Sequence, residues 1–257
     1  MKKISKKLIA VVGLTVFTLG FTISLSAFAA TTPTLGAASI FGVISSTFTR
    51  NIGLTVINGA IGYTTLSGGG THGVSGTTYV PAPAQAGIDQ GAALSNLNGQ
   101  TCTAIGSVVD LATFDIDGVG PILPGHFTPG CYSSTGAMNI GGGGTITLDG
   151  VGTYIFRSDG ALGTTANSSV TLNGASACDL FWTPTGATTL GANSTFVGNV
   201  IDPAGITIGN NVMWSGQALA YGGTVTADTD TITVPACSII PVVPIVSTTV
   251  AGQTHSN

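Results

Sequence analysis

The sequence predicts a mainly β fold, a three-faced β-solenoid with one α-helix packed alongside it. Three observations indicate this fold: a repeat of about 18 residues in the second half of the chain, 39 glycines among 257 residues, and few charged side chains, with 10 Asp, no Glu and 6 Lys or Arg. Coils of this length, rich in Thr, Val and Ile and punctuated by Gly and Asn, are typical of three short strands separated by tight turns. Stacked coils repeat each side chain about every 4.8 Å, so ladders of like charge would repel.

Residues 1–29 are expected to be a signal peptide. Four of the six cations lie within the first seven residues, an apolar stretch covers residues 8–25, and a small-residue cleavage site ends at Ala29. An uncleaved membrane anchor is the alternative, because the apolar stretch approaches spanning length. Only Arg50 and Arg157 follow this segment, which excludes the nucleic-acid-binding class.

Residues 30–237 are expected to form one domain, since a chain of this size can bury about 70–75% of its unfolded surface around one core. Residues 238–257 have the composition of a linker or an attachment segment. The four cysteines are an even number without Cys-x-x-Cys spacing, which fits disulfides in an exported protein. Three pairings are open. We favour Cys102–Cys131 and Cys178–Cys237, because each joins neighbours within one half of the chain.

The first part of the domain breaks the repeat in two places. Residues 35–63 contain alternating apolar and polar runs that predict strands and a partial coil. Residues 83–97 are the one predicted helix, with Ala84, Ile88 and Ala92 on a shared face. Gly87 and Gly91 flank that face and would permit close approach to a sheet, although they lower the helix propensity, so we expect the helix to depend on tertiary packing.

The second part of the domain carries the repeat itself. Three segments, residues 187–200, 205–218 and 223–233, align without gaps, and weaker copies at residues 144–150 and 166–174 bring the count to at least five coils. Gly and Asn at the repeated corners suit positive φ, and the repeated large apolar residues predict a stacked core. The aligned sets are Gly191, Gly209 and Ala227; Asn193, Asn211 and Thr229; Phe196, Trp214 and Ile232; and Gly198 with Gly216.

Several motifs together resemble the secreted microbial ice-binding proteins. They lie at residues 55–62, 123–132, 152–156, 173–182, 187–198, 216–221 and 230–232, so the resemblance covers about residues 35–237. It implies a right-handed, discontinuous solenoid with a helix alongside, in which coils from the two ends of the chain interleave. It also implies a secreted protein that binds ice and inhibits ice growth or recrystallisation.

The resemblance further implies that one flat solenoid face binds ice through arrays of the form Thr-Ala/Gly-x-Thr/Asn. Residues 185–188 and 226–229 match this form. The candidate face is the row of predicted strand positions Met138, Ile140, Leu162, Thr164, Thr188, Leu190, Ile206, Ile208, Thr224 and Thr226. A slip of one residue would instead turn Thr189, Thr207 and Val225 outward.

Other functions leave weaker signals. A polysaccharide-degrading solenoid needs grouped carboxylates, but the close acidic pairs, Asp115 with Asp117 and Asp228 with Asp230, are explained by loops and turns. The three histidines, His72, His126 and His255, are far apart and lack metal-ligand spacing, and Arg157 is expected to pair with an Asp.

We therefore expect a secreted, non-enzymatic monomer that binds ice. It should need no metal, no cofactor, no nucleic acid and no obligate small-molecule ligand. The alternative is a cell-surface adhesin or an envelope scaffold without ice activity.

Overall fold

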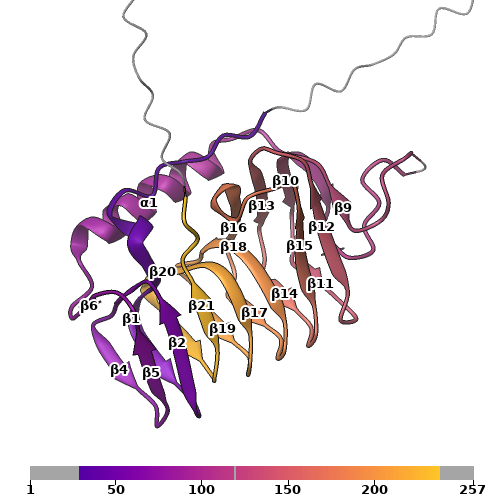
Figure 1. Ribbon diagram of the computed structural model, residues 1–257. Helices are drawn as coiled ribbons and strands as arrows, with labels where there is room; N and C mark the ends of the chain where they lie inside the picture. The colour runs from indigo at the N-terminus through magenta and orange to yellow at the C-terminus, as the bar shows by residue number, and fades with distance from the viewer. Residues whose placement is uncertain (1–28, 119, 238–257) are drawn as a thin grey trace, which may run out of the picture.

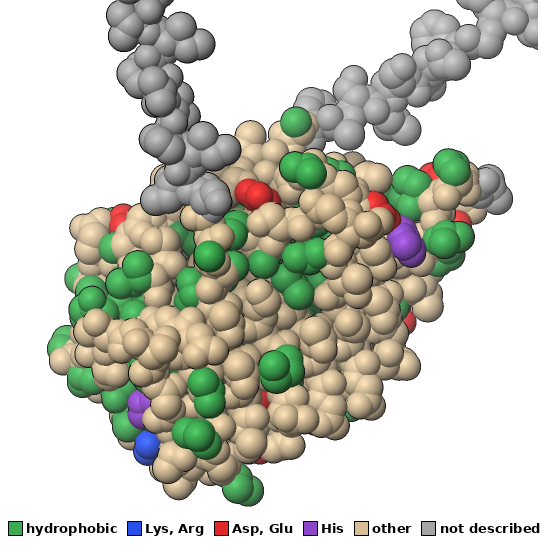
Figure 2. Space-filling view, viewed as in Figure 1, with side chains coloured by type: hydrophobic (Ala, Val, Ile, Leu, Met, Phe, Trp, Pro, Cys, Tyr) green, Lys and Arg blue, Asp and Glu red, His purple; other side chains and the backbone are tan. Residues whose placement is uncertain are grey.

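The computed structural model describes residues 29–118 and 120–237, which form a right-handed, three-faced β-solenoid with one α-helix along its side (Figure 1). The expected signal peptide, the expected tail and His255 lie outside the described residues. Figure 2 shows a surface with few charged side chains, as the composition predicted. Among the described residues, no helix is both long enough and apolar enough to span a membrane.

Every strand ladder of the solenoid is parallel, and the ladders form three sheets. The first, the helix-side sheet, contains β7 (Thr103–Gly106), β10 (Gly130–Ser134), β13 (Tyr154–Ser158), β16 (Leu180–Pro184), the end of β18 (Thr195–Ile201), the middle of β20 (Met213–Ala227), the start of β1 (Phe41–Arg50), β3 (Ala60–Gly62) and β6 (Thr78–Tyr79).

The second sheet contains β8 (Val109–Asp110), β11 (Met138–Ile140), β14 (Leu162–Thr164), β17 (Thr188–Leu190), β19 (Ile206–Ile208), the ends of β20 and β1, and β4 (Thr65–Ser67). The third sheet contains β9 (His126–Phe127), β12 (Thr145–Asp149), β15 (Ser169–Asn173), the starts of β18 and β20, β21 (Thr231–Thr233), β2 (Leu54–Asn58) and β5 (Thr71–Val74).

The chain builds these coils in two blocks. Strands β1 to β6 form the coils at one end, and α1 (Ala84–Asn98) then runs back along the helix-side sheet to the other end, where β7 begins the second block (Figure 1). This block returns coil by coil until β20 and β21 pair with β1 and β2. Coils from the two ends of the chain therefore meet at one junction and do not alternate. Two short 3-10 helices, η1 (Gly36–Ile40) and η2 (Ala177–Asp179), complete the described elements.

The aligned large residues of the repeat stack in the core, as predicted. Phe196 pairs with Trp214, which pairs with Ile232, and all three are at most 2% exposed. Farther along the stack, the rings of Phe156 and Trp182 lie 4.5 Å apart between centroids. Both Trp indoles are buried and donate to backbone carbonyls, so neither is placed to stack on a sugar.

The corner between the second and third sheets has a left-handed backbone in four successive coils. The residues there are Asn167, Asn193, Asn211 and Thr229, with φ values of 64°, 57°, 63° and 61°. Asn adopts this conformation more readily than other non-Gly residues. The Asn211 side chain also donates to the Asn193 side chain at 3.0 Å, which ties neighbouring coils together.

The helix begins one residue later than predicted and buries a different face. Its buried residues are Ala86, Gln90, Ala93 and Leu97, whereas Ile88 is 63% exposed. The predicted face of Ala84, Ile88 and Ala92 is therefore wrong, because Ile88 points to solvent and the small side chains of Ala86 and Ala93 allow closer packing on the sheet. The buried Gln90 side chain instead accepts from the Tyr221 backbone N–H at 3.1 Å.

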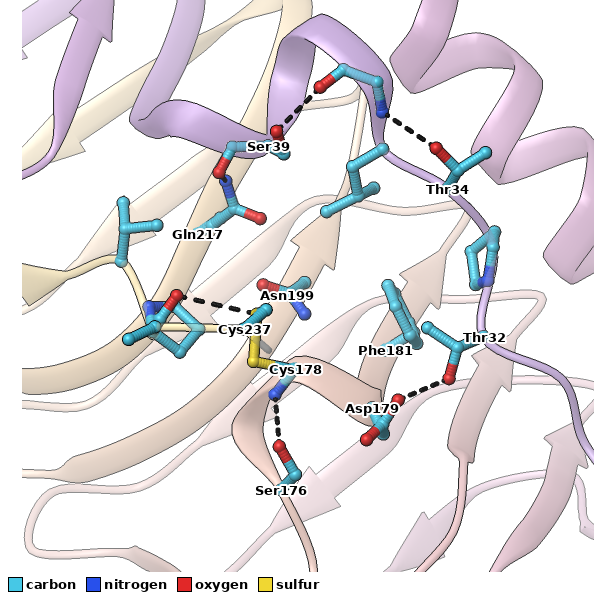
Figure 3. A pocket seen from close by; sticks show the side chains of 16 residues that line it. Thr32, Thr34, Ser39, Ser176, Cys178, Asp179, Phe181, Asn199, Gln217 and Cys237 are labelled. Atoms are coloured by element: carbon cyan, nitrogen blue, oxygen red, sulfur yellow. Dashed lines mark hydrogen bonds between the residues drawn. A yellow bond between two sulfur atoms is a disulfide. The ribbon is translucent and has the colours of Figure 1, made fainter. Parts of the chain in front are cut away.

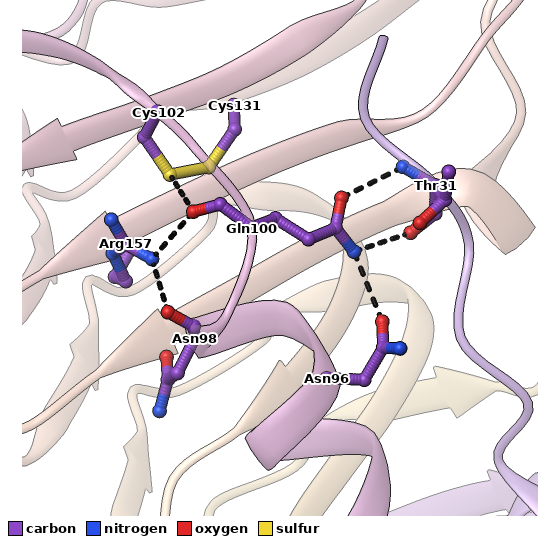
Figure 4. The surroundings of a disulfide bond; sticks show 7 residues. All are labelled: Thr31, Asn96, Asn98, Gln100, Cys102, Cys131 and Arg157. Atoms are coloured by element: carbon purple, nitrogen blue, oxygen red, sulfur yellow. Dashed lines mark hydrogen bonds between the residues drawn. A yellow bond between two sulfur atoms is a disulfide. The ribbon is translucent and has the colours of Figure 1, made fainter. Parts of the chain in front are cut away.

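Both favoured disulfides are present in the structure. Cys178–Cys237 ties η2 to the end of the described chain and borders a hollow of about 720 Å³ (Figure 3). Cys102–Cys131 lies beside the C-terminal end of α1 (Figure 4). These pairings close sequence separations of 59 and 29 residues, respectively.

Arg157 does not pair with an Asp, so this expectation from the sequence is wrong. Its Nη1 donates to the carbonyl oxygens of Asn98 at 2.7 Å and Gln100 at 3.1 Å (Figure 4). Helix C-terminal carbonyls lack intrahelical partners and carry partial negative charge, so they attract the guanidinium.

Candidate functional site

The second sheet contains the whole predicted ice-binding row. The helix packs on the helix-side sheet, and no described element covers the outward side of the second sheet. Strand alternation decides which side chains reach that outward side, because successive residues point to opposite faces.

Most of the predicted row points inward. Eight of its ten residues are at most 9% exposed: Met138, Ile140, Leu162, Thr164, Thr188, Leu190, Ile206 and Ile208. Only Thr224 is exposed, and Thr226 is half-buried. The predicted orientation is therefore wrong by one residue on β11, β14, β17 and β19, and correct on β20.

Between β19 and β20 the equivalent positions switch from pointing inward to pointing outward. The structural cause lies at one corner of the last coil. Ile206 pairs with Val225, one residue later than the repeat register requires. Gly222, with φ of 90°, lies in the corner before this pairing, and the β1–β20 ladder is irregular at the same level. The alternative prediction was that Thr189, Thr207 and Val225 point outward. It is correct for Thr189 and Thr207, which are exposed, and wrong for Val225, which is 0% exposed.

The outward residues form a continuous surface of small, uncharged side chains, here called the threonine face. Strand pairing connects Gly163, Thr189, Thr207, Thr226, Thr49 and Ser67 in one row. A second row joins Thr224, Thr47 and Thr65. With Ala161 and Ala187, which precede the inward residues of β14 and β17, these eleven residues make up the threonine face.

Charged groups lie at the borders of the threonine face. At one end, Asp110 of β8 is the strand partner of Asn139 of β11. Its Oδ1 accepts hydrogen bonds from the backbone N–H groups of Ala112 at 3.1 Å and Gly141 at 3.0 Å. At the other end, the Arg50 guanidinium lies against the carbonyls of Ser67 and Gly68, both at 3.4 Å. The face itself therefore carries no charged side chain.

The two inward threonines of the predicted row serve the fold. Thr188 Oγ1 donates to Asp202 Oδ2 at 2.6 Å, and Thr164 Oγ1 accepts from the Gly191 backbone N–H at 2.8 Å. Burial raises the pKa of the Asp202 carboxyl, and the hydrogen bonds from Thr188 and nearby backbone groups oppose that shift. These partners explain how a β-branched polar residue occupies a core position.

The third sheet is the other uncovered face and is less regular. Its outward residues include Thr171, Thr195 and Thr231, but Met213, which is 54% exposed, aligns with Thr195 and Thr231 in one row. A long thioether between threonines breaks the flatness of the row.

The acidic residues of the sequence analysis do not assemble into a catalytic group. Asp115 and Asp117 accept backbone N–H groups within their own loop. Asp230 is 1% exposed and accepts from the N–H groups of Val212 and Asp228, and burial raises its pKa to about 6. In the described part of the chain, no three His, Cys or Asp side chains form a group that could hold a metal ion.

One hydrogen-bonded group of a His, an Asp and an Asn lies at the end of the third sheet. His126 Nδ1 is 2.7 Å from Asp149 Oδ2, and Asn173 donates to the other carboxylate oxygen of Asp149 at 2.6 Å. The Asn173 bond, followed by the His126 bond, holds the pKa of Asp149 below its usual value. These contacts connect the last three strands at one end of the third sheet, and they lie outside the threonine face.

The hollow beside Cys178–Cys237 also lies away from the threonine face. Its walls include Phe181, Asn199 and Gln217 from the helix-side sheet, and at one side Thr32 Oγ1 donates to Asp179 Oδ1 at 2.6 Å (Figure 3). The amide group of Asn199 donates to backbone carbonyls of η2 and of the residue after it, and that of Gln217 donates to carbonyls of η1 and of the start of β1, so both amides hold neighbouring backbone in place.

Comparison with known proteins gives consistent matches. The model of a family described as ice-binding-like matches residues 30–233. An ice-binding protein of Nostoc sp. (strain HG1) is 30% identical over 244 residues, covering 90% of this chain and 84% of that protein. An ice-binding protein of Flavobacterium frigoris (strain PS1) is 30% identical over 210 residues, covering 78% of this chain and 76% of that protein.

Solved structures match at the level of the fold and of the sequence. The ice-binding protein of the Antarctic ascomycete Antarctomyces psychrotrophicus has a TM-score of 0.65 and 30% identity, covering 80% of this chain and all of that chain (100%). An ice-binding protein from an Antarctic biological consortium has a TM-score of 0.70 and 26% identity, covering 83% of this chain and 96% of that chain.

Proposed function

Because residues 30–233 match its model, the chain belongs to the ice-binding-like family, and we propose that it adsorbs to ice through the threonine face. Its function is ice binding, and the protein acts as an antifreeze protein that limits ice growth or recrystallisation. One observation supports the choice of face: an uncovered, uncharged ladder of small residues continues through β14, β17, β19, β20, β1 and β4.

The chemistry of the threonine face suits an uncharged crystalline surface. Ice presents regularly spaced water oxygens, so a binder needs regularly spaced groups that order water. Parallel strands place equivalent residues about 4.8 Å apart, and each Thr offers one hydroxyl and one methyl group. β-branched side chains are stiff at χ1, so little side-chain entropy is lost when the face meets ice.

The backbone holds this face rigid. Beneath it, Ile206, Ile208 and Leu190 are at most 1% exposed, and their packing fixes the strands from the inside. The left-handed Asn corner described above anchors the border toward the third sheet. The face is therefore organised before it meets ice, which reduces the ordering cost of adsorption.

Replacement of Thr189 and Thr207 by Tyr tests the face directly. Both residues are exposed neighbours in one row, so two large rings would stand out of the flat surface. We expect loss of thermal hysteresis and of ice recrystallisation inhibition, while the melting temperature changes little, because exposed substitutions typically cost less than about 0.5 kcal/mol.

The matched control is the double replacement of Thr171 and Thr195 by Tyr on the third sheet, where both residues are also exposed. This variant should keep its activity. If the control variant lost activity while the Thr189/Thr207 variant kept it, and circular dichroism showed both folded, the ice-binding surface would be on the third sheet.

We also propose that the protein works outside the cell and by adsorption alone. Export is supported by the lysine-rich apolar start of the sequence and by the two disulfides, which persist in oxidising compartments. A role without catalysis is supported by the acidic residues, which bind backbone N–H groups of their own loops and turns, and no three His, Cys or Asp side chains of the described residues form a group that could hold a metal ion. Recovery of the protein from culture medium by ice-affinity partitioning tests its export and its adsorption to ice.

A further inference from the structure

Hydroxyl groups are distributed unevenly over the threonine face. Three neighbouring strands, β20, β1 and β4, each turn two hydroxyl-bearing residues outward, two positions apart along the strand. These six residues are here called the hydroxyl grid, with Thr224, Thr47 and Thr65 in its first column and Thr226, Thr49 and Ser67 in its second column. The grid combines strands from both ends of the chain, which lie together because the two blocks of coils meet at this junction.

Beyond the grid, only one column of hydroxyls continues. On β17 and β19 the second column is extended by Thr189 and Thr207, whereas the first column is extended by Ala187 and Gly205. Gly205 has a φ of 121°, a conformation in which residues with a side chain are strained. A threonine is therefore disfavoured at this position, and the first column of hydroxyls ends at β20.

The structure around the grid fixes its strands and leaves its hydroxyls available. Ser46 Oγ donates to the carbonyl oxygens of Gly222 at 3.2 Å and Gly223 at 2.9 Å, which holds β1 against the corner of β20. Beneath the grid, Phe48 and Val225 are strand partners, and both are 0% exposed. The described residues give none of the six grid hydroxyls a hydrogen-bond partner within the protein, so each can bind water.

We infer that the hydroxyl grid determines which planes of ice the protein recognises, an inference that rests on the proposed function. Neighbouring strands lie about 4.8 Å apart, and outward residues along one strand lie about 6.6 Å apart, so the grid repeats in two directions. A single column repeats in one direction, so it aligns a line of water molecules but not a layer. Because a crystal plane is defined by two repeats, the grid can distinguish one plane from another and the single column cannot.

The rest of the threonine face has a different role. Ala161, Gly163 and Ala187 allow a flat surface to approach without obstruction, but their side chains offer neither a donor nor an acceptor to water. Their contribution is therefore similar for any flat plane of ice. The small residues add contact area, whereas the stiff, regularly spaced threonines of the grid add selectivity.

Two matched double variants test this division on single-crystal ice. Thr65→Ala with Thr224→Ala removes two exposed hydroxyls from the first column of the grid, and Thr189→Ala with Thr207→Ala removes two exposed hydroxyls outside the grid. Alanine leaves the surface flat, unlike the tyrosines used to test the whole face. Fluorescently labelled protein, adsorbed to a growing ice hemisphere, shows which planes are bound.

The wild-type chain should label a discrete set of planes, and the variant changed outside the grid should label the same planes. The grid variant should lose this discrete pattern. The protein concentration needed for half-maximal labelling of the wild-type planes should rise at least about tenfold in the grid variant, because two contacts with ordered water are lost.

Circular dichroism reports whether each variant is folded, and Thr224→Ala alone replaces the grid variant if the double variant does not fold. The inference is overturned if a folded grid variant labels the wild-type planes with wild-type affinity. It is also overturned if the control variant loses the pattern to the same extent, because the face would then act as one uniform surface. A wild-type chain that does not adsorb to ice would instead contradict the proposed function, and this inference with it.

Discussion

Two adjacent threonines on β17 have opposite roles. Thr188 is 0% exposed and hydrogen-bonds Asp202, whereas Thr189 is exposed on the threonine face. Threonine fits both sides of a strand, since its methyl group packs in a core and its hydroxyl is satisfied by a buried partner. The sequence contains no nearby sign that Asp202, 14 residues away, supplies that partner. The sheet that carries the candidate face could therefore be predicted from the sequence, but which of its residues point outward could not.

The buried carboxyls make the stability depend on pH. A carboxyl whose pKa is higher in the folded chain than in the unfolded chain stabilises the fold most below its unfolded value, and this contribution is lost as the pH rises through its folded value. Asp230 shifts from 3.8 to about 6, which corresponds to on the order of 3 kcal/mol. The pKa of Asp202 is raised by burial in the same direction.

We expect the contribution of these two carboxyls to lower the unfolding free energy as the pH rises from about 4 to 7, and this loss should be smaller in Asp202→Asn than in the wild-type chain. The Asn side chain can still accept from the Ala204 N–H and donate to Thr188 Oγ1, so only the buried charge is removed. Thermal unfolding across this pH window measures the slope. Asp159→Asn, at an exposed position, is the control. Equal slopes for Asp202→Asn and wild type would contradict the assignment.

For the strands and the helix, the repeat predicted how the coils stack more reliably than it predicted whether each residue points into the core or outward. The large residues Phe196, Trp214 and Ile232 stack as aligned because only the core accommodates them. The outer strands lack such an anchor, so an extra residue at the corner near Gly222 changed their parity without disturbing the core. The helix was predicted within one residue at each end, but its buried face was not, because a face of Ala residues has little hydrophobic contrast with its surroundings.

Two glycines in α1 offer a matched test of this packing. A Cβ at Gly87 would lie 2.5 Å from the Tyr221 ring, whereas a Cβ at Gly91 would meet nothing within 4 Å. We expect Gly91→Ala to stabilise the protein by about 0.5–1 kcal/mol through helix propensity. Gly87→Ala should gain less or destabilise, because the Tyr221 ring must move.

Chemical denaturation of both variants measures this difference. Replacement of Tyr221 by Ser should restore the benefit of Ala at position 87 if the ring is the obstacle. An equal gain from both Ala variants in the wild-type background would show that the helix lies farther from the sheet.

At the scale of the whole molecule, the disulfides hold segments that are distant in sequence. Cys178–Cys237 closes a separation of 59 residues, so the chain-entropy account assigns it about 4 kcal/mol. Replacement of both cysteines by Ser should lower the unfolding free energy by about that amount. Because the bond borders the hollow and not the threonine face, ice recrystallisation inhibition per folded molecule should not change. A large loss of activity in a sample that is still folded would show that the chain end influences the face.

The order of the coils along the chain also limits how a longer solenoid of this kind can arise. Both ends of the described chain, near Thr32 and Cys237, line the same hollow, whereas the two ends of the solenoid are formed by internal segments. These two ends of the described chain lie on the flank of the molecule, and neither of them forms a rung of the threonine face. Longer faces in evolution, or in engineering, would require in-frame duplication of an internal coil, and each duplicated coil would add one more rung to the surface. A length of face gained in this way would leave the hollow and the two chain segments that line it unchanged.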